Sequence, residues 1–146
     1  MRHAWSGYMM NAFGKDEVSP VSGGYKEKWG GLATTLVDSL ETLWIMDMKV
    51  EFYKAKDWIA ERLDFHKNVR VSVFETTIRS LGGLLSAYDW SGESIFLEKA
   101  EDLGRRLLRA FDGAMMDIPF GNVNLKTGTN ENNILCLECR SLLASW

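Results

Sequence analysis

A glutamate and an arginine stand one helical turn apart in the segment VSVFETTIRSLGGLLSAY, residues 71–88. Glu75 and Arg79 have the i,i+4 spacing at which two side chains meet on one face of a helix. The carboxylate can act as a general acid or base, and the guanidinium can grip a polar substrate through several hydrogen bonds. The same spacing also occurs in ordinary surface ion pairs, which contribute about 0.3–0.5 kcal/mol. Spacing alone favours the surface pair.

Two glycines follow this pair. Gly82 and Gly83 each cost a helix about 1 kcal/mol relative to alanine, a loss that is tolerated where another backbone or a ligand comes close. Gly82 is expected on the same face as Arg79, which gives that face few side chains. An arginine favours the ionised form of a neighbouring carboxylate, whereas a general acid must hold a proton. An acid role for Glu75 therefore requires burial, or an arginine that faces mainly toward the substrate.

Other polar side chains give weaker signals. Asp38 and Glu41 lie three residues apart in TLVDSLETLWIM and repel each other, so we expect either a basic partner or, more often, open solvent around them. Cys136 and Cys139 form a single C-x-x-C pair, without the second pair of a zinc site or a βαβ pattern for redox chemistry. We interpret them as ordinary helix residues. The two histidines have no ligand partners in spacing, and no D-x-[DN]-x-[DN]-G calcium loop is present.

Composition excludes several classes of function. The chain has 146 residues, 46% of them apolar, and a net charge of -3, as expected for one globular domain with a real core. It has no basic stripe for nucleic acid. No run of eighteen apolar residues predicts a membrane span, and the opening MRHAWSGYMM lacks the apolar segment of a secretory signal. The chain itself therefore predicts neither a signal nor an anchor, which taken literally indicates the cytosol.

The apolar period is helical nearly throughout, so the predicted fold class is all-α. Helices are expected over residues 1–13, 32–46, 50–63, 71–88, 94–111 and 133–145. Turn-rich segments such as VSGGYKEKWGG, DWSGES and GNVNLKTGTNENN separate them. The stripes expected to face the core are Leu32, Leu36, Leu40 and Leu43; Phe74, Ile78, Leu81, Leu85 and Tyr88; and Phe96, Ala100, Leu103, Leu107 and Phe111.

A weak internal repeat adds to this picture. A shift of about 45 residues matches Leu36 with Leu81 and Leu40 with Leu85, so that each unit is a helix, a turn and a second helix. Such αα-hairpins bury their faces against neighbouring hairpins, although a chance coincidence of leucines gives the same match. The last segment, ILCLECRSLLASW, has helical apolar spacing up to Trp146 and ends there without a helix-end signal. We therefore expect the chain to be a piece of a longer one.

Four long blocks carry a resemblance to a known family. HAWSGYMMNAFGKDEVSPVSG is similar to A-W-x-x-Y…A-x-G-x-D-E-x-x-P, and GGLATTLVDSLETLWIM is similar to G-L-x-x-T-L-x-D-[AS]-L-D-T-L-x-I-M. VSVFETTIRSLGGLLSAY is similar to V-S-x-F-E-x-x-I-R-x-L-G-G-L-L-S-A-Y, and IPFGNVNLKTG is similar to I-P-x-x-x-V-N-x-x-T-G. Together, and in this order over almost the whole chain, the blocks resemble the class I α-1,2-mannosidases, glycoside hydrolase family 47.

The resemblance implies a fold and an activity. The fold is an (α/α)7 barrel of helix hairpins, of which residues 1–146 would form the N-terminal part, about three of the seven pairs. The activity is hydrolysis of α-1,2-linked mannose from high-mannose N-glycans, with inversion and a bound calcium ion. Glu75 falls on the general acid, which acts through a water, and Arg79 falls on an arginine that contacts the glycan. Glu138 aligns with a glutamate that lines the sugar cleft.

The resemblance also implies what this chain does not supply. An inverting glycosidase uses a second carboxylate to activate water, and the family's base, a further aspartate and the threonine that binds calcium all align beyond Trp146. We therefore expect the 146 residues alone to be inactive. A non-catalytic mannose-glycan binder of the glycoprotein quality-control type is the alternative, and a short helical scaffold without a glycan role ranks last. Family members work in the endoplasmic reticulum or Golgi lumen, or are secreted.

Overall fold

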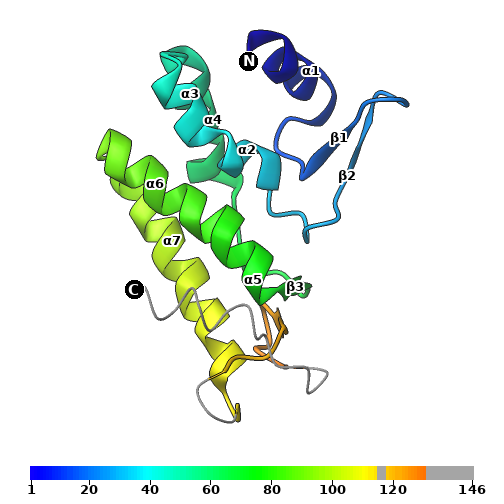
Figure 1. Cartoon of the computed structure of the whole chain (residues 1–146), viewed down its shortest axis with the longest axis vertical. Coiled ribbons are helices and arrows are strands. Elements are labelled where there is room, and N and C mark those ends of the chain that lie inside the picture. The colour runs from blue at the N-terminus through cyan, green and yellow to red at the C-terminus, as the bar shows by residue number, and fades with distance from the viewer. Residues whose placement is uncertain (115–117, 131–146) are drawn as a thin grey trace.

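The structure is a computed structural model that describes residues 1–114 and 118–130. Its long helices pack as antiparallel neighbours, and the chain runs from α1 at one end of the molecule to the α6–α7 pair at the other (Figure 1). The helices are α1 (Arg2–Ala12), α2 (Thr34–Asp38), α3 (Leu40–Ile45), α4 (Lys49–Arg62), α5 (Val73–Thr76), α6 (Gly82–Ser91) and α7 (Ser94–Leu107), with a π-helical turn at Thr77–Leu81 and a 3-10 turn at Leu108–Phe111.

The helical predictions are largely confirmed. Helices occupy five of the six expected ranges, and the sixth, residues 133–145, lies outside the described residues together with Glu138 and both cysteines. The expected helix over 32–46 is broken into α2 and α3 at Ser39, whose hydroxyl donates to the carbonyl of Thr35 at 2.6 Å. A side chain that bonds back to its own helix in this way bends it.

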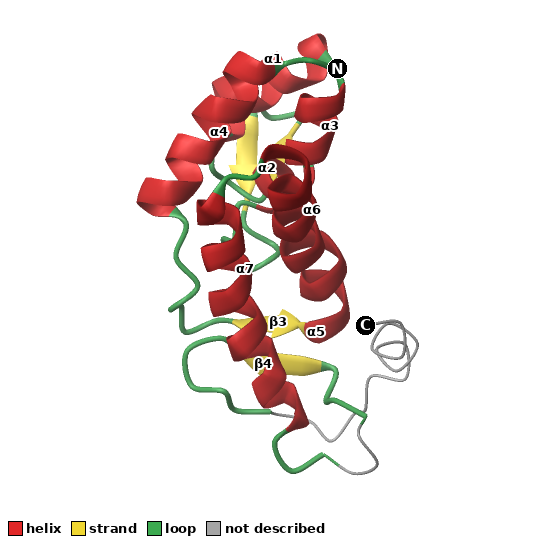
Figure 2. Ribbon diagram, turned by 90° about the vertical axis from the view of Figure 1, so that its left-hand side faces the viewer, coloured by secondary structure: helices red, strands yellow, loops and turns green. Residues whose placement is uncertain are grey.

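Two helix–turn–helix units follow each other, as the internal repeat predicts. In the first, α2 and α3 lead through a tight turn into α4; in the second, α5, the π turn and α6 lead into α7. In Figure 2, α6 and α7 lie side by side. Leu36, Leu40 and Leu43 are fully buried, as are Phe52, Phe96 and Leu103 from the facing helices. The first and third predicted stripes therefore face the core, with Phe111 half-buried at the end.

The stripe predicted for residues 71–88 is confirmed only in part. Phe74, Leu81 and Leu85 are half-buried and pack against the core, whereas Ile78 and Tyr88 are 42% and 37% exposed. The buried face is the one with smaller side chains, because α2, α3 and α7 pack closely against it. Small residues let helices approach, and the larger apolar side chains then lie at the edges of the contact. The buried residues of this element are Val73, Thr76, Ser80, Leu84 and Ala87.

Two short antiparallel ribbons interrupt the helical pattern. β1 (Glu17–Ser19) pairs with β2 (Gly24–Lys26), and β3 (Arg70–Ser72) pairs with β4 (Asn122–Asn124), with Val71 opposite Val123. Sequence reasoning missed them because three residues are too few to show an alternating pattern. β3 leads directly into α5, so this ribbon fixes where that helix begins (Figure 2).

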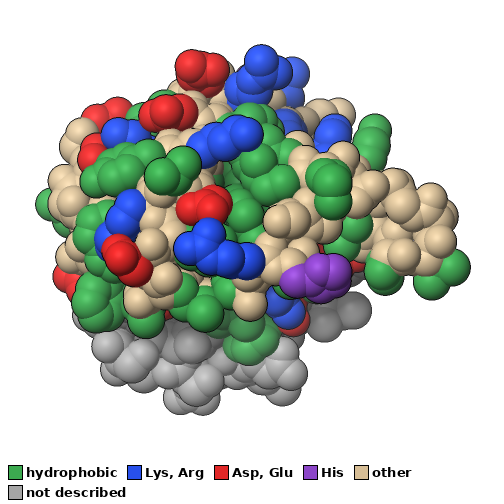
Figure 3. Space-filling model, turned by 90° about the horizontal axis from the view of Figure 1, so that it is seen from above, with side chains coloured by type: hydrophobic (Ala, Val, Ile, Leu, Met, Phe, Trp, Pro, Cys, Tyr) green, Lys and Arg blue, Asp and Glu red, His purple; other side chains and the backbone are tan. Residues whose placement is uncertain are grey.

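The surface carries both signs of charge. On the face seen in Figure 3, basic and acidic side chains are interspersed among apolar ones. This arrangement fits the small net charge of -3 and differs from the continuous basic stripe of a nucleic-acid-binding surface. Among the described residues, none of the helices combines the length and the apolar character needed to cross a membrane.

Candidate active site

Glu75 lies in the first turn of α5, and the sequence before it explains its position. Ser72 is the N-cap of this helix, and its hydroxyl accepts a hydrogen bond from the backbone N–H of Glu75 at 3.4 Å. The sequence S-x-x-E is a capping-box pattern, in which the glutamate side chain normally reaches back to the N-cap. Here a Glu75 carboxylate oxygen, Oε2, accepts from Nε of Arg79 at 2.7 Å. The carboxylate therefore points along the helix, toward the pocket.

Arg79 lies inside the π-helical turn Thr77–Leu81. Such turns are rare, and they occur frequently at functional sites. The hydroxyl of Thr77 donates to the carbonyl of Val73 at 2.7 Å, where the turn begins. Arg79 is 41% exposed and Glu75 30%, so their ion pair is neither fully solvated nor buried. The hydrogen bond to Glu75 is the main cause that raises the pKa of Arg79 above its ordinary value.

A close approach between two helices explains Gly83, the second glycine of the Gly-Gly pair. A Cβ atom on Gly83 would lie 3.0 Å from Cγ1 of Val37 and 3.2 Å from its carbonyl oxygen, closer than ordinary van der Waals contact. A Cβ on Gly82 would meet the carbonyl of Thr77 at an ordinary 3.5 Å. Gly83 thus lets the end of α2 pack against α6. The residue that follows Val37 is Asp38, so this contact also brings Asp38 toward Arg79.

Asp38 is the third charged residue at the site. Its Oδ2 lies 3.4 Å from Nη1 of Arg79, and its side chain is 35% exposed. Burial raises the pKa of Asp38 above the ordinary value, the positive charge of Arg79 opposes this, and the negative charge of Glu75 adds to it. Of the two environments expected for Asp38, a basic partner is therefore confirmed. Glu41, its neighbour in sequence, is exposed.

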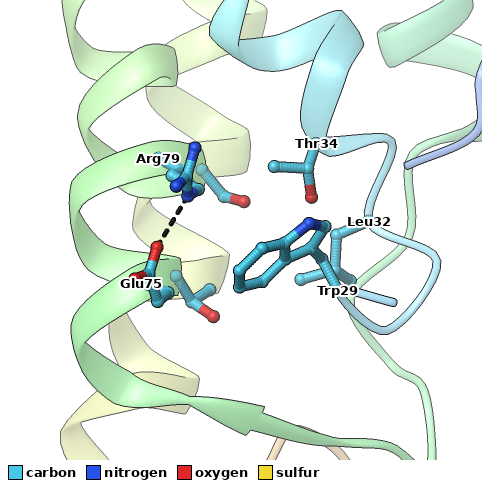
Figure 4. A pocket seen from close by; sticks show the side chains of 7 residues that line it. Trp29, Leu32, Thr34, Glu75 and Arg79 are labelled. Carbon is cyan, nitrogen blue, oxygen red and sulfur yellow. Dashed lines mark hydrogen bonds and ion pairs between the residues drawn. The ribbon is translucent and has the colours of Figure 1, made fainter. Parts of the chain in front are cut away.

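Trp29 faces the pair from the other side of the pocket (Figure 4). The Arg79 guanidinium carbon lies 5.1 Å from the centre of the Trp29 ring, within the range of a cation–π contact. The indole N–H of Trp29 donates to Oε1 of Glu17 at 2.9 Å. Two contacts therefore fix the ring: its N–H bonds to Glu17 of β1, and its face lies against the Arg79 guanidinium.

Asp16 holds the loop that presents Trp29. This carboxylate is fully buried, and it accepts hydrogen bonds from the backbone N–H groups of Trp29 and Gly31 at 2.8 Å and of Thr34 at 3.3 Å. Several backbone donors can stabilise a buried carboxylate in place of a basic side chain. Sequence reasoning did not single out Asp16 or Trp29. The only signal was the position of Trp29 between polar residues and a Gly-Gly turn.

A small pocket, partly open to solvent and about 10 Å³ in volume, lies between the Glu75–Arg79 pair and the loop that carries Trp29. Leu32 lies beside Trp29 on the loop side (Figure 4), and the hydroxyl-bearing side chains of Thr34, Thr76 and Ser80 also line the pocket. This volume suits about one water molecule, which needs a cavity of about 10–15 Å³. The lining residues are Trp29, Leu32, Thr34, Glu75, Thr76, Arg79 and Ser80.

The chain matches the family model described as glycosyl hydrolase family 47 over residues 1–145. The chain belongs to glycosyl hydrolase family 47. It is 55% identical over 126 residues to an endoplasmic reticulum mannosyl-oligosaccharide 1,2-alpha-mannosidase of Rattus norvegicus, covering 86% of this chain and 19% of that protein. It is 50% identical over 144 residues to mannosyl-oligosaccharide 1,2-alpha-mannosidase MNS1 of Arabidopsis thaliana, covering 99% of this chain and 26% of that protein.

A solved family 47 structure confirms the fold. The alpha-1,2-mannosidase from Trichoderma reesei matches with a TM-score of 0.80 and 27% identity, covering 92% of this chain and 29% of that one. The helix hairpins described above are therefore part of an (α/α)7 barrel. The chain spans 19% to 29% of the length of these relatives.

Proposed function

We propose that this chain supplies the general-acid side of the active site of a mannosyl-oligosaccharide 1,2-α-mannosidase, which hydrolyses α-1,2-linked mannose from high-mannose N-glycans. The observation that carries the proposal is the Glu75–Arg79 pair, joined at 2.7 Å and lining a polar pocket. Family membership supports the substrate class, since the rat and Arabidopsis relatives carry this activity in their names. The name of the rat relative also supports the endoplasmic reticulum lumen as the location of this activity; a Golgi or secreted location belongs to the same proposal.

In this proposal Glu75 donates a proton to the glycosidic oxygen that leaves, through a water held in the pocket. The hydroxyl groups of Thr34, Thr76 and Ser80 line the same pocket and suit an ordered water, which makes about three hydrogen bonds where it is buried. Arg79 lines the same pocket, and in this proposal its guanidinium also donates to sugar hydroxyl groups. Inversion also requires a second carboxylate about 6.5–9.5 Å from the acid, with room for the attacking water. We assign that base to none of the described residues.

The calcium ion and Glu138 belong to the proposal by resemblance. Within residues 1–114 and 118–130, no three His, Cys, Asp or Glu side chains are grouped so that they could hold a metal ion. The described residues therefore do not fit the ion, and we derive no step through it. Glu138 lies outside the described residues, and its proposed contact with the sugar rests on its alignment in ILCLECRSLL.

The test compares two glutamates in the complete gene product. Glu75→Gln removes the acid, whereas Glu101→Gln makes the same chemical change in an exposed i,i+4 pair with Arg105 on α7. Hydrolysis of an α-1,2-linked mannose oligosaccharide should fall by about 10²–10⁴ in Glu75→Gln and stay unchanged in Glu101→Gln. Proton NMR of the first anomer released checks inversion. Full activity in Glu75→Gln would show that Glu75 is not the general acid. Glycan binding without hydrolysis by the unmodified protein would favour the non-catalytic glycan binder.

A further inference from the structure

We propose that Asp38 is a positioning residue for the acid: it supplies the counter-charge of Arg79 when Glu75 carries its proton. This inference rests on the proposed function, because only a general acid must hold a proton beside an arginine. It addresses a conflict visible in the sequence itself. A guanidinium one helical turn from a carboxylate favours the ionised carboxylate, which opposes the protonated form that the acid role requires.

The geometry allows one guanidinium to serve two carboxylates at once. Nε of Arg79 faces Glu75 at 2.7 Å, and Nη1 faces Asp38 at 3.4 Å. The two carboxylates therefore use different nitrogens and do not compete for one N–H. Trp29 covers the guanidinium at 5.1 Å, which limits the directions in which Arg79 can turn. When Glu75 is protonated, the shift in hydrogen bonding toward Asp38 requires little movement.

The net charge of Glu75, Arg79 and Asp38 also supports this role of Asp38. With Glu75 ionised, the three side chains carry a net charge of -1; with Glu75 protonated, Asp38 and Arg79 sum to zero. Within the described residues, Arg79 and Glu75 are the charged groups that act on the Asp38 carboxylate, from the π turn and from α5. Asp38 itself comes from α2. Its partial burial disfavours an ionised carboxylate, and the positive charge of Arg79 offsets this.

The packing shows how Asp38 reaches this position. Gly83 allows Val37 to approach α6 more closely than a Cβ atom would permit without a shift of a few tenths of an ångström. The glycine that weakens the helix therefore brings a second carboxylate, on a neighbouring element, to the same arginine. A position that breaks a local rule, here glycine in the interior of a helix, is where a functional reason is expected.

The experiment uses three variants of the complete gene product. Asp38→Asn removes the charge and keeps the shape, Asp38→Glu restores the charge, and Glu41→Gln removes an exposed charge three residues along the chain. The readout is kcat/KM for an α-1,2-linked mannose oligosaccharide as a function of pH. The alkaline limb of Asp38→Asn should move to lower pH by about half a unit, as expected for the loss of one partly exposed charge, and Asp38→Glu should restore it.

A role in folding alone would lower activity at every pH and leave the limb where it is, and this result would overturn the proposal. An equal shift in Glu41→Gln would also overturn it, since the effect would then be one of general surface charge.

A second measurement does not depend on activity or on the stability of an Asp38 variant. Carbon NMR can follow the titration of the Asp38 carboxyl in the unmodified protein and in Glu75→Gln. Removing the negative charge of Glu75 should lower the pKa of Asp38, because that charge raises it. An unchanged titration would refute the coupling. If the unmodified protein is inactive but the titration moves, the proposed function fails while the charge sharing at Arg79 stands.

Discussion

Gly83 offers a direct test of the helix packing that forms the site, through its replacement by alanine. The new methyl group would lie 3.0 Å from Cγ1 and 3.2 Å from the carbonyl oxygen of Val37. Relief of that overlap requires α2 and α6 to separate by a few tenths of an ångström, or the α6 backbone to shift. Overpacking of this kind costs about 1–3 kcal/mol, whereas alanine gains about 1 kcal/mol of helix propensity over glycine. The net expectation is a loss of up to about 2 kcal/mol of the free energy of unfolding.

Gly104 provides the matched control. It lies inside α7, and a Cβ atom there would meet Cδ1 of Leu81 at 4.0 Å, which is ordinary contact. Gly104→Ala should therefore gain the propensity term of about 1 kcal/mol without a clash. Because that gain is common to both variants, the difference between them, about 1–3 kcal/mol, measures the contact with Val37. Thermal unfolding of the complete gene product, followed by circular dichroism, gives the two midpoints. Equal midpoints for Gly83→Ala and Gly104→Ala would refute the close approach.

Two further predictions concern carboxylates. Asp16→Asn should destabilise the protein by about 1–3 kcal/mol, measured by thermal unfolding. The buried side chain accepts hydrogen bonds from Trp29 and Gly31, and the amide would lose the charge-assisted bonds and turn an N–H₂ group toward backbone donors. An unchanged midpoint would contradict this role. Asp38→Asn should instead stabilise the protein at neutral pH. The pKa of Asp38 is raised in the folded protein, so the stability linked to its protonated form is present at acid pH and is lost as pH rises through that pKa. The variant should therefore have a higher midpoint than the unmodified protein at pH 7, and the gain should vanish well below the ordinary pKa of 3.8; a lower midpoint at pH 7 would show that the bond to Arg79 outweighs burial.

The helices were predictable because each combines a regular apolar period with a turn-rich segment at its ends, as α4 and α7 do. The break between α2 and α3 at Ser39 was not predictable, because serine is common within helices and only its hydrogen bond to the Thr35 carbonyl indicates the bend. On α6 the most buried residues, Leu84 and Ala87, lie beside the predicted stripe, of which Leu85 packs against the core and Tyr88 is exposed. Large apolar side chains dominate a sequence pattern, but close helix packing selects the face with small ones.

Part of the site was also predictable. Glu75 and Arg79 follow from one local spacing, which the helix preserves through the π turn. The sequence indicated that Asp38 could need a basic partner, but it did not identify Arg79, which lies 41 residues further along the chain. Trp29 depends on Asp16, which is 13 residues away in sequence and acts through backbone groups. Spacing carries no information about contacts of that kind, because they are set by the tertiary fold.

The β3–β4 ribbon has a consequence for the order in which this region forms. Ser72, the cap of the helix that carries Glu75, lies opposite Asn122, and the N–H of Val73 donates to the carbonyl of Gly121 at 3.0 Å. About fifty residues must therefore close into a loop before the start of α5 is fixed, and such long-range closure is slow compared with helix formation. During synthesis on the ribosome, α6 and α7 emerge before β4 does. The acid would then be the last part of this hairpin to reach its final position.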